Sequence, residues 1–174
     1  VSLFLYVAAQ TGINSFFINY ATEAAGVSAH EASVWLSFGG MGLFMAGRMG
    51  GSWLMRAVRA EKVLAGCAVG ATLSMAAVIL LPGKAGWYAL LLCFLCESIM
   101  FPTIFALALR RAGSQTKRAS SFLIMSIVGG AIAPILMGYI ADSSSMATGF
   151  VIPLLCFVVI GVYAMRYGKL LGKK

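Results

Sequence analysis

The sequence predicts an all-α membrane protein with six transmembrane helices arranged as two inverted three-helix repeats, and three observations support this. Hydrophobic residues make up 61% of the 174-residue chain and charged residues only 10%, whereas soluble domains average roughly 45–50% and about 25%. Six apolar segments are each long enough, at about 20 residues, to cross a hydrocarbon core of about 30 Å. The hydropathy pattern of the first three segments recurs in the last three, about 90 residues later, as Gly39-Gly40 recurs at Gly129-Gly130.

The six predicted spans occupy nearly the whole chain, so residues 1–174 form a single six-helix bundle with almost nothing left for a soluble domain. Because the chain begins inside an apolar segment, without an initiator methionine, we expect it to be a fragment of a longer protein. The spans run from Ser2 to Thr22, Ser33 to Met55, Val63 to Leu81, Trp87 to Leu109, Ala119 to Ala141 and Gly149 to Tyr167.

The basic residues alternate between the connections, and this pattern predicts the orientation. The loops that follow spans two, four and six carry most of the basic residues. The loops on the opposite side of the membrane carry only Lys84, together with acidic residues. The positive-inside rule therefore makes the connections after spans two, four and six, and both chain termini, cytoplasmic. The net charge of +8 is spread over loops, so it does not predict a nucleic-acid-binding face. The residues concerned are Arg56, Arg59, Lys62, Arg110, Arg111, Lys117, Arg118, Arg166, Lys169, Lys173 and Lys174.

The first span carries Tyr6, Gln10 and Asn14 at intervals of four residues, which places them on one stripe of a helix. Amides at this depth gain only about 0.6 kcal/mol on average when they bond across helices. They act either as interhelical hydrogen-bonding groups or as the lining of a polar cavity, and we expect the cavity. Asn19 lies off this stripe and is a weaker candidate.

The second span is rich in glycine, and Gly47 and Gly51 form a GxxxG motif that allows close helix approach. Arg48 lies about two turns from the predicted cytoplasmic end. At this position it can extend toward the membrane surface or cap a neighbouring helix, so we expect a structural or gating role. The third span carries small residues and is predicted to be a supporting helix.

The fourth span carries one carboxylate, Glu97, and one proline, Pro102. A charged residue in the middle of a membrane helix costs roughly 2.5–3.5 kcal/mol on insertion scales, so Glu97 must face protein or water. Pro102 frees a carbonyl one turn earlier, which neighbouring helices or water must satisfy. Glu97 is either a substrate or proton site or a buried acid bonded to a neighbour. Phe101, on the same stripe, is a further candidate, although aromatic residues here more often serve in packing.

The fifth span contains Gly129-Gly130 and then Pro134, which predicts a bendable helix of the kind that a gating element requires. The sixth span has Pro153 and little polarity, so we interpret it as scaffold. Gln10 and Asn14 in one repeat and Glu97 in the other occupy equivalent positions near the midplane. This convergence predicts a polar binding site shared by the two repeats.

Nothing in the sequence predicts a metal or cofactor site. Cys93 and Cys96 form a CxxC, but without a second pair or nearby histidines they are predicted to be packing residues. The single histidine, His30, falls in a predicted outer loop from Glu23 to Ala32. A membrane-embedded enzyme would need a nucleophile and base, or paired metal ligands, at one depth. The isolated acids do not supply such a pair, so we expect no enzyme.

Three segments resemble the fucose:proton symporter family of the major facilitator superfamily, which includes bacterial glucose/galactose transporters. They are YVAAQTGINSFFIN at Tyr6 to Asn19, FPTIF at Phe101 to Phe105 and TKRASSF at Thr116 to Phe122. The resemblance covers essentially the whole chain, as the carboxyl-terminal six-helix half of a 12-helix transporter. It implies proton-driven hexose uptake, with Gln10 and Asn14 as sugar contacts and Gly47-Arg48 as part of a cytoplasmic latch.

The chain departs from this family in two respects. The family's proton-carrying acids are expected in the amino-terminal half, outside this chain, and Glu97 stands where the fucose symporter has a neutral residue. Glu97 is therefore expected to accept hydrogen bonds from sugar hydroxyls, with proton coupling as a second possibility. We expect an integral protein of the bacterial inner membrane whose partners are a sugar, a proton, the bilayer and the other half.

The function predicted from these features is hexose transport by alternating access, for a fucose, glucose or galactose type of sugar. One alternative is export of small amphipathic compounds, which would favour a more aromatic cavity. Another is a membrane-embedded enzyme or a structural module. The candidate substrate-binding residues are Gln10, Asn14, Glu97, Tyr6, Asn19 and Phe101, and the candidate gating residues are Gly47, Arg48, Gly129, Gly130 and Pro134.

Overall fold

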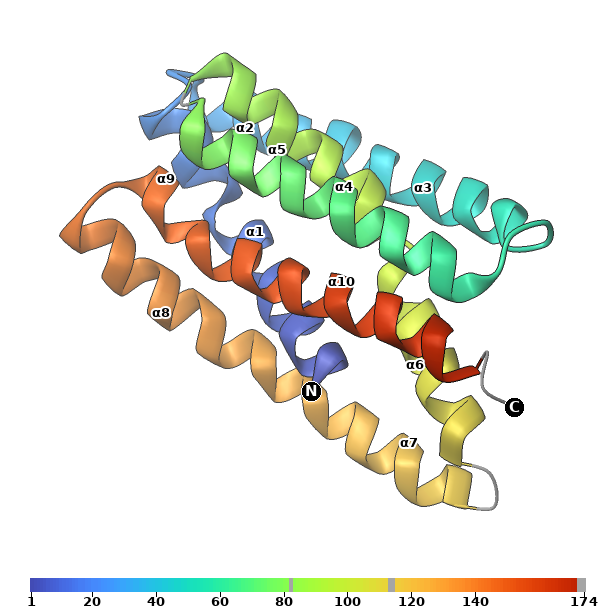
Figure 1. Ribbon diagram of the computed structural model, residues 1–174. Helices are drawn as coiled ribbons and strands as arrows, with labels where there is room; N and C mark the ends of the chain where they lie inside the picture. Colours follow the sequence, from blue (N-terminus) through green and yellow to red (C-terminus); the bar gives the residue numbers. More distant parts are fainter. Residues whose placement is uncertain (82, 113–114, 172–174) are drawn as a thin grey trace.

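A computed structural model describes residues 1–81, 83–112 and 115–171, and these form six helical rods with no β-strand among them (Figure 1). Each rod overlaps one of the six predicted spans. In chain order the rods are α1 (Ser2–Glu23); α2 (Ala29–Val34), the π-helix η1 (Trp35–Gly40) and α3 (Met41–Leu54); α4 (Ala60–Leu80); α5 (Lys84–Glu97) and α6 (Met100–Ala112); α7 (Thr116–Met125), the 3₁₀ helix η3 (Ser126–Val128) and α8 (Gly129–Ser143); α9 (Met146–Gly149) and α10 (Val151–Leu171).

Within the described residues, four helices are long and apolar enough to cross a membrane. They are Ala60–Leu80, Lys84–Arg110, Thr116–Ser143 and Met146–Tyr167. α1 has the length to cross, at 22 residues, but it carries the polar side chains of Gln10, Asn14 and Asn19. The second rod is divided into three shorter helical segments. The two rods outside this group of four are therefore the first and the second.

The second rod begins earlier than the sequence predicted, because part of the expected outer loop is helical. α2 starts at Ala29, and His30 lies in its first turn rather than in a loop. The Ser28 hydroxyl caps this helix by accepting a hydrogen bond from the Glu31 amide at 3.2 Å. Ser28-x-x-Glu31 is the spacing of a capping box, a helix-start signal that the hydropathy pattern alone does not reveal.

The connections that the sequence predicted to be cytoplasmic gather at one end of the bundle. Figure 1 places the α3–α4 connection, the end of α6, the start of α7 and the end of α10 there. The α1–α2, α4–α5 and α8–α9 connections lie at the opposite end. Exposed basic residues, among them Arg56, Arg59 and Arg118, thus share one end, which is the distribution that the positive-inside rule requires of a membrane protein.

α1 lies inside the bundle and packs against α8, α10 and α6. Ten of its residues are buried, including the large side chains of Tyr6, Phe17 and Tyr20. α4 packs between α10 and α5, while α3 packs on α5 and α8 on α1. The second rod therefore lies on the fourth, and the fifth lies on the first, as equivalent elements of two three-helix repeats would.

Each of these two outer contacts depends on a glycine that lets the backbones approach. A Cβ atom at Gly129 of α8 would lie 2.5 Å from the Phe4 carbonyl oxygen of α1. A Cβ atom at Gly47 of α3 would collide with the Ser98 hydroxyl and lie 2.5 Å from the Leu95 carbonyl oxygen. The predicted GxxxG residue Gly47 is thus a point of close helix contact.

Candidate functional site

The fourth rod is interrupted at the level of its only acid. α5 ends at Glu97 and α6 begins at Met100, so Ser98 and Ile99 lie between two helices. Pro102 explains the break, because a proline has no N–H to donate to the carbonyl four residues earlier, which is that of Ser98. The sequence predicted a kink here, and the structure shows it as a two-residue break in the helix.

Side chains from two other helices satisfy the carbonyls at this break. The Tyr6 hydroxyl of α1 donates a hydrogen bond to the Glu97 carbonyl oxygen at 2.9 Å. Arg48 Nε of α3 donates to the Ser98 carbonyl oxygen at 3.2 Å. Regular backbone bonding resumes with the Thr103 amide, which donates to the Ile99 carbonyl oxygen at 3.2 Å. Of the two interpretations left open for Arg48, the structure therefore shows the one in which it caps a neighbouring helix.

The Glu97 side chain is completely buried, with an exposed fraction of 0%. Cys93, one helical turn earlier, donates from Sγ to Oε1 at 3.7 Å. The other carboxyl oxygen, Oε2, is buried and has no hydrogen-bond partner among the described residues. Buried polar atoms in proteins are nearly always paired, so this oxygen is an exception among the described residues.

Asn14 supplies a second buried acceptor of the same kind. Its Oδ1 atom has no hydrogen-bond partner among the described residues, while the rest of the side chain is partly exposed, as is Gln10. Asn19 is exposed. The polar stripe of α1 therefore runs from Tyr6, inside the core, to amides at its edge.

Two aromatic contacts join α1 to the fourth rod, one on each side of Glu97 along the sequence. Phe17 meets Phe94 edge-on, with ring centroids 5.7 Å apart. Tyr6 meets Phe101 at 6.0 Å. Asn14 lies between Tyr6 and Phe17 on α1, and Glu97 lies between Phe94 and Phe101 on the opposite rod. The two unpaired oxygens thus belong to the two rods that these contacts join. A binding site shared by Gln10, Asn14 and Glu97 stays a prediction.

The remaining candidates divide into two groups. Phe101 is partly buried and stacks on Phe105, with centroids 6.3 Å apart, next to the break. Gly129 and Gly130 lie instead where α8 contacts α1, against Phe4 and Thr11. Pro134 is inside α8. The candidate gating residues are therefore split between the α3 contact at the break, with Gly47 and Arg48, and the α8 contact with α1.

Ser98 and Thr11 are not among the residues predicted from the sequence. Ser98 is buried, and its carbonyl is the group that Arg48 caps. Counting four residues back from Pro102 would have identified it. Thr11 contacts the α8 backbone through its hydroxyl, which would lie 2.7 Å from a Cβ atom at Gly130, and no feature of the sequence pointed to it. In the part of the chain that the structure describes, no group of three potential metal ligands is found.

Comparisons with known proteins identify relatives along nearly the whole chain. It is 40% identical over 163 residues to the L-fucose-proton symporter of Escherichia coli (strain K12), covering 92% of this chain and 37% of that protein. It is 35% identical over 171 residues to the glucose/galactose transporter of Brucella abortus biovar 1 (strain 9-941), covering 97% and 41%. No protein-family model matches the chain.

A solved structure agrees closely with this fold. The crystal structure of the Major Facilitator Superfamily transporter FucP in the outward conformation matches with a TM-score of 0.92 and 39% identity, over 95% of this chain and 40% of that one. The chain therefore spans less than half the length of the relatives it matches, and the similarity extends over all six helical rods.

Proposed function

Because the chain belongs to the fucose:proton symporter and glucose/galactose transporter family of the major facilitator superfamily, we propose that it forms the carboxyl-terminal half of a hexose:proton symporter that works by alternating access. The observation that carries the proposal is the pair of unpaired buried oxygens, Asn14 Oδ1 on α1 and Glu97 Oε2 on the fourth rod. A sugar offers several hydroxyl donors on one small molecule, so it can supply a donor to each of two such acceptors.

In this proposal the sugar reaches the partly exposed amides of Gln10 and Asn14 first. Each amide offers both donors and acceptors, so it can bond to hydroxyl groups in either role. Phe101 provides an apolar surface beside them, and Asn19 lies further along the entry path. Tyr6 and Glu97 are fully buried behind this surface. Contact between Glu97 Oε2 and a sugar hydroxyl therefore requires α1 and α5 to move apart during the cycle. The second possible role of Glu97 is in proton coupling.

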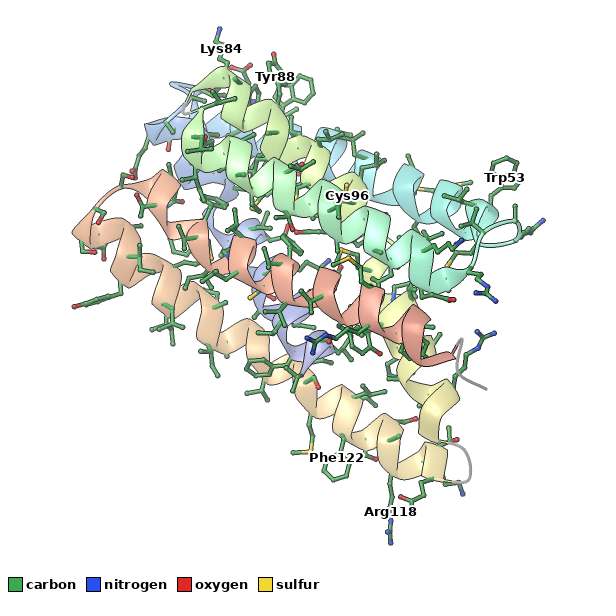
Figure 2. The ribbon with its side chains drawn as sticks, viewed as in Figure 1. Trp53, Lys84, Tyr88, Cys96, Arg118 and Phe122 are labelled. Atoms are coloured by element: carbon green, nitrogen blue, oxygen red, sulfur yellow. The ribbon has the colours of Figure 1, made fainter. Side chains whose placement is uncertain are left out.

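The second and fifth rods are proposed to face the amino-terminal six-helix half. Neither α3 nor α7 has a buried residue, and Figure 2 shows Trp53 and Phe122 pointing away from the bundle. These two side chains are 72% and 70% exposed. Large apolar side chains exposed on a membrane bundle contact another protein surface or lipid. Gly47, Arg48, Gly129, Gly130 and Pro134 lie on these same rods, where the two halves would rock against each other.

The orientation proposed for the protein follows from the basic end of the bundle. With that end in the cytoplasm, both chain termini are cytoplasmic and the protein is an integral protein of the bacterial inner membrane. The proton-carrying acids are then supplied by the other half, and this half supplies sugar contacts and gating elements. Neither a cofactor nor a metal takes part in this mechanism.

The proposal is tested by sugar uptake in cells that produce the full-length transporter. We expect uptake of one or more labelled hexoses from a panel of fucose, glucose and galactose, and we expect a protonophore to abolish accumulation because the proton gradient drives it. Uptake that a protonophore leaves unchanged would contradict proton coupling, and failure to take up any hexose while exporting an amphipathic dye would favour the exporter alternative.

A second test concerns the amides of α1. Replacing Asn14 with Ala in the full-length transporter removes a neutral hydrogen bond to the sugar, which is worth about 0.5–1.5 kcal/mol, so the KM for the sugar should rise by about two- to tenfold. Thr72→Val on α4 is the matched control, because the hydrogen bond of Thr72 among the described residues is to the Ala68 carbonyl of its own helix, at 2.7 Å. An Asn14→Ala variant with an unchanged KM would remove Asn14 from the binding site.

A further inference from the structure

We propose that Arg48 is a positioning residue which supplies the hydrogen bond that Pro102 cannot make, and that it thereby fixes the break in the fourth rod. The two residues come from different helices and are linked through a third group, the Ser98 carbonyl. The proposal that this bond positions a binding site rests on the sugar site described above. The existence of the brace itself does not depend on that site.

At the break, one backbone carbonyl has lost the donor that a continuous helix would provide. In a continuous helix, the amide of residue 102 would donate to the carbonyl of residue 98. Pro102 has no N–H, and the donor found at the Ser98 carbonyl oxygen is Arg48 Nε, at 3.2 Å. One position later, the Thr103 amide donates to the Ile99 carbonyl oxygen, also at 3.2 Å. Arg48 thus donates to the carbonyl that has no backbone donor because residue 102 is a proline.

The close packing of α3 against the break places Arg48 beside the Ser98 carbonyl. Gly47 brings the α3 backbone so close to the break that a Cβ atom there would collide with Ser98. One turn further, a Cβ atom at Gly51 would lie 2.9 Å from Ile99. The Arg48 guanidinium also lies over the Phe44 ring, 4.9 Å from its centroid. Contacts on both sides of Arg48 therefore limit where its Nε–H can point.

The carbonyl that Arg48 caps belongs to a buried residue, Ser98. Ser98 has an exposed fraction of 0%, and its own hydroxyl is engaged in donating to the Leu95 carbonyl oxygen at 2.7 Å. Arg48 itself is exposed and the bond is only partly buried, so the buried end of the bond is the carbonyl of Ser98. An unsatisfied carbonyl within a membrane-spanning rod costs several kcal/mol. Arginine suits this role because Nε provides a directed N–H close to the side-chain stem, and its terminal amino groups remain for other contacts.

The consequence for transport is a fixed geometry at the proposed sugar site. Glu97 is the last residue before the break and Phe101 follows just after it. The Tyr6 hydroxyl holds the Glu97 carbonyl from the α1 side, and Arg48 holds the next carbonyl from the α3 side. The relative orientation of Glu97 and Phe101 is therefore set by two donors on two different helices.

The brace is tested by a double-mutant cycle in the purified full-length transporter, using Arg48→Met, Pro102→Ala and the double variant. Methionine keeps the apolar stem without a donor, and alanine at position 102 restores an N–H for the Ser98 carbonyl. We expect Arg48→Met to lower the melting temperature by several degrees in the presence of Pro102 and to have little effect in the Pro102→Ala background. Equal losses in both backgrounds would overturn the proposal.

Two further measurements keep the test decisive. If Arg48→Met alone fails to accumulate in the membrane, recovery of its abundance by Pro102→Ala is the expected result, and absence of both variants would overturn the proposal. Arg59→Gln is the matched control, because Arg59 is exposed and pairs only with Glu61, at 3.9 Å, among the described residues. This control should leave the melting temperature unchanged in either background.

Sugar uptake then separates positioning from stability. At matched membrane abundance, Arg48→Met should raise the KM for the transported hexose by about tenfold, and Arg48→Lys, which keeps a donor, should recover part of that change. An unchanged KM would limit Arg48 to a structural role and overturn the positioning claim. The melting-temperature cycle needs no sugar, so the brace can be confirmed even if hexose transport is disproved.

Discussion

Replacing Glu97 with Gln in the full-length transporter is expected to reduce hexose uptake by about ten- to a hundredfold. Glutamine has nearly the same size and keeps the contact with Cys93, but its amide nitrogen cannot accept a hydrogen bond as Oε2 does. Hydrogen bonds to a charged group are worth about 1.5–3 kcal/mol, and this range sets the loss expected for a Glu97 that is ionised when the sugar is bound. The measurement is the initial rate of labelled sugar uptake, at several pH values, in cells with matched amounts of transporter.

Glu23→Gln is the control for this experiment. Glu23 is the last residue of α1 and is exposed at the end of the bundle opposite the basic connections, so its substitution should not affect uptake. If Glu97→Gln instead takes up sugar at the normal rate and with unchanged pH dependence, Glu97 is neither a sugar contact nor a proton carrier. It would then be a buried acid whose role is limited to packing and to its bond with Cys93.

Replacing Gly129 with Ala is expected to destabilise the bundle by about 1–3 kcal/mol, the usual cost of forcing extra atoms into a packed interior. The new Cβ atom would lie 2.5 Å from the Phe4 carbonyl oxygen. That oxygen belongs to the α1 backbone, so the whole α8 helix must shift to relieve the contact. The expected readouts are a lower melting temperature in detergent and a lower abundance in the membrane.

Gly50→Ala provides the comparison, because nothing lies within 4 Å of the Cβ position at Gly50. Alanine is also the better helix former, so this variant should be as stable as the parent or slightly more stable. If both substitutions had the same effect, the close contact between α8 and α1 would not contribute to stability. The fifth rod would then be held to the first by its other side chains alone.

The sequence was sufficient to predict the broad architecture. Composition and segment length predicted an all-α membrane fold, and the solved structure of FucP matches it with a TM-score of 0.92. Pro102 predicted a kink, because the missing N–H is a property of the residue itself. The need for a donor at the freed carbonyl followed from the same property, and Arg48 was recognised as able to cap a neighbouring helix.

Other features depend on contacts between distant residues and could not be derived in this way. Hydropathy placed Glu97 in an interior, but the packing of other helices against the fourth rod decides that its exposed fraction is 0%. The same packing leaves Gln10 partly exposed, although Gln10 and Tyr6 share one stripe of α1. Periodicity gives the face of a helix on which a residue lies, and the depth of the neighbouring helix then decides how deeply that residue is buried.

The π-helix η1, from Trp35 to Gly40, has a consequence for the side chains that follow it. A π-helical turn contains more residues than the 3.6 of an α-helix, so everything after Gly40 is rotated about the helix axis relative to an uninterrupted α-helix. One residue corresponds to a rotation of about 100°. The rotational phase of α3, and with it the side of the rod from which Arg48 leaves, is thus set eight residues upstream of Arg48, in a segment that packs on α5 near Leu91 and Phe94, before the break.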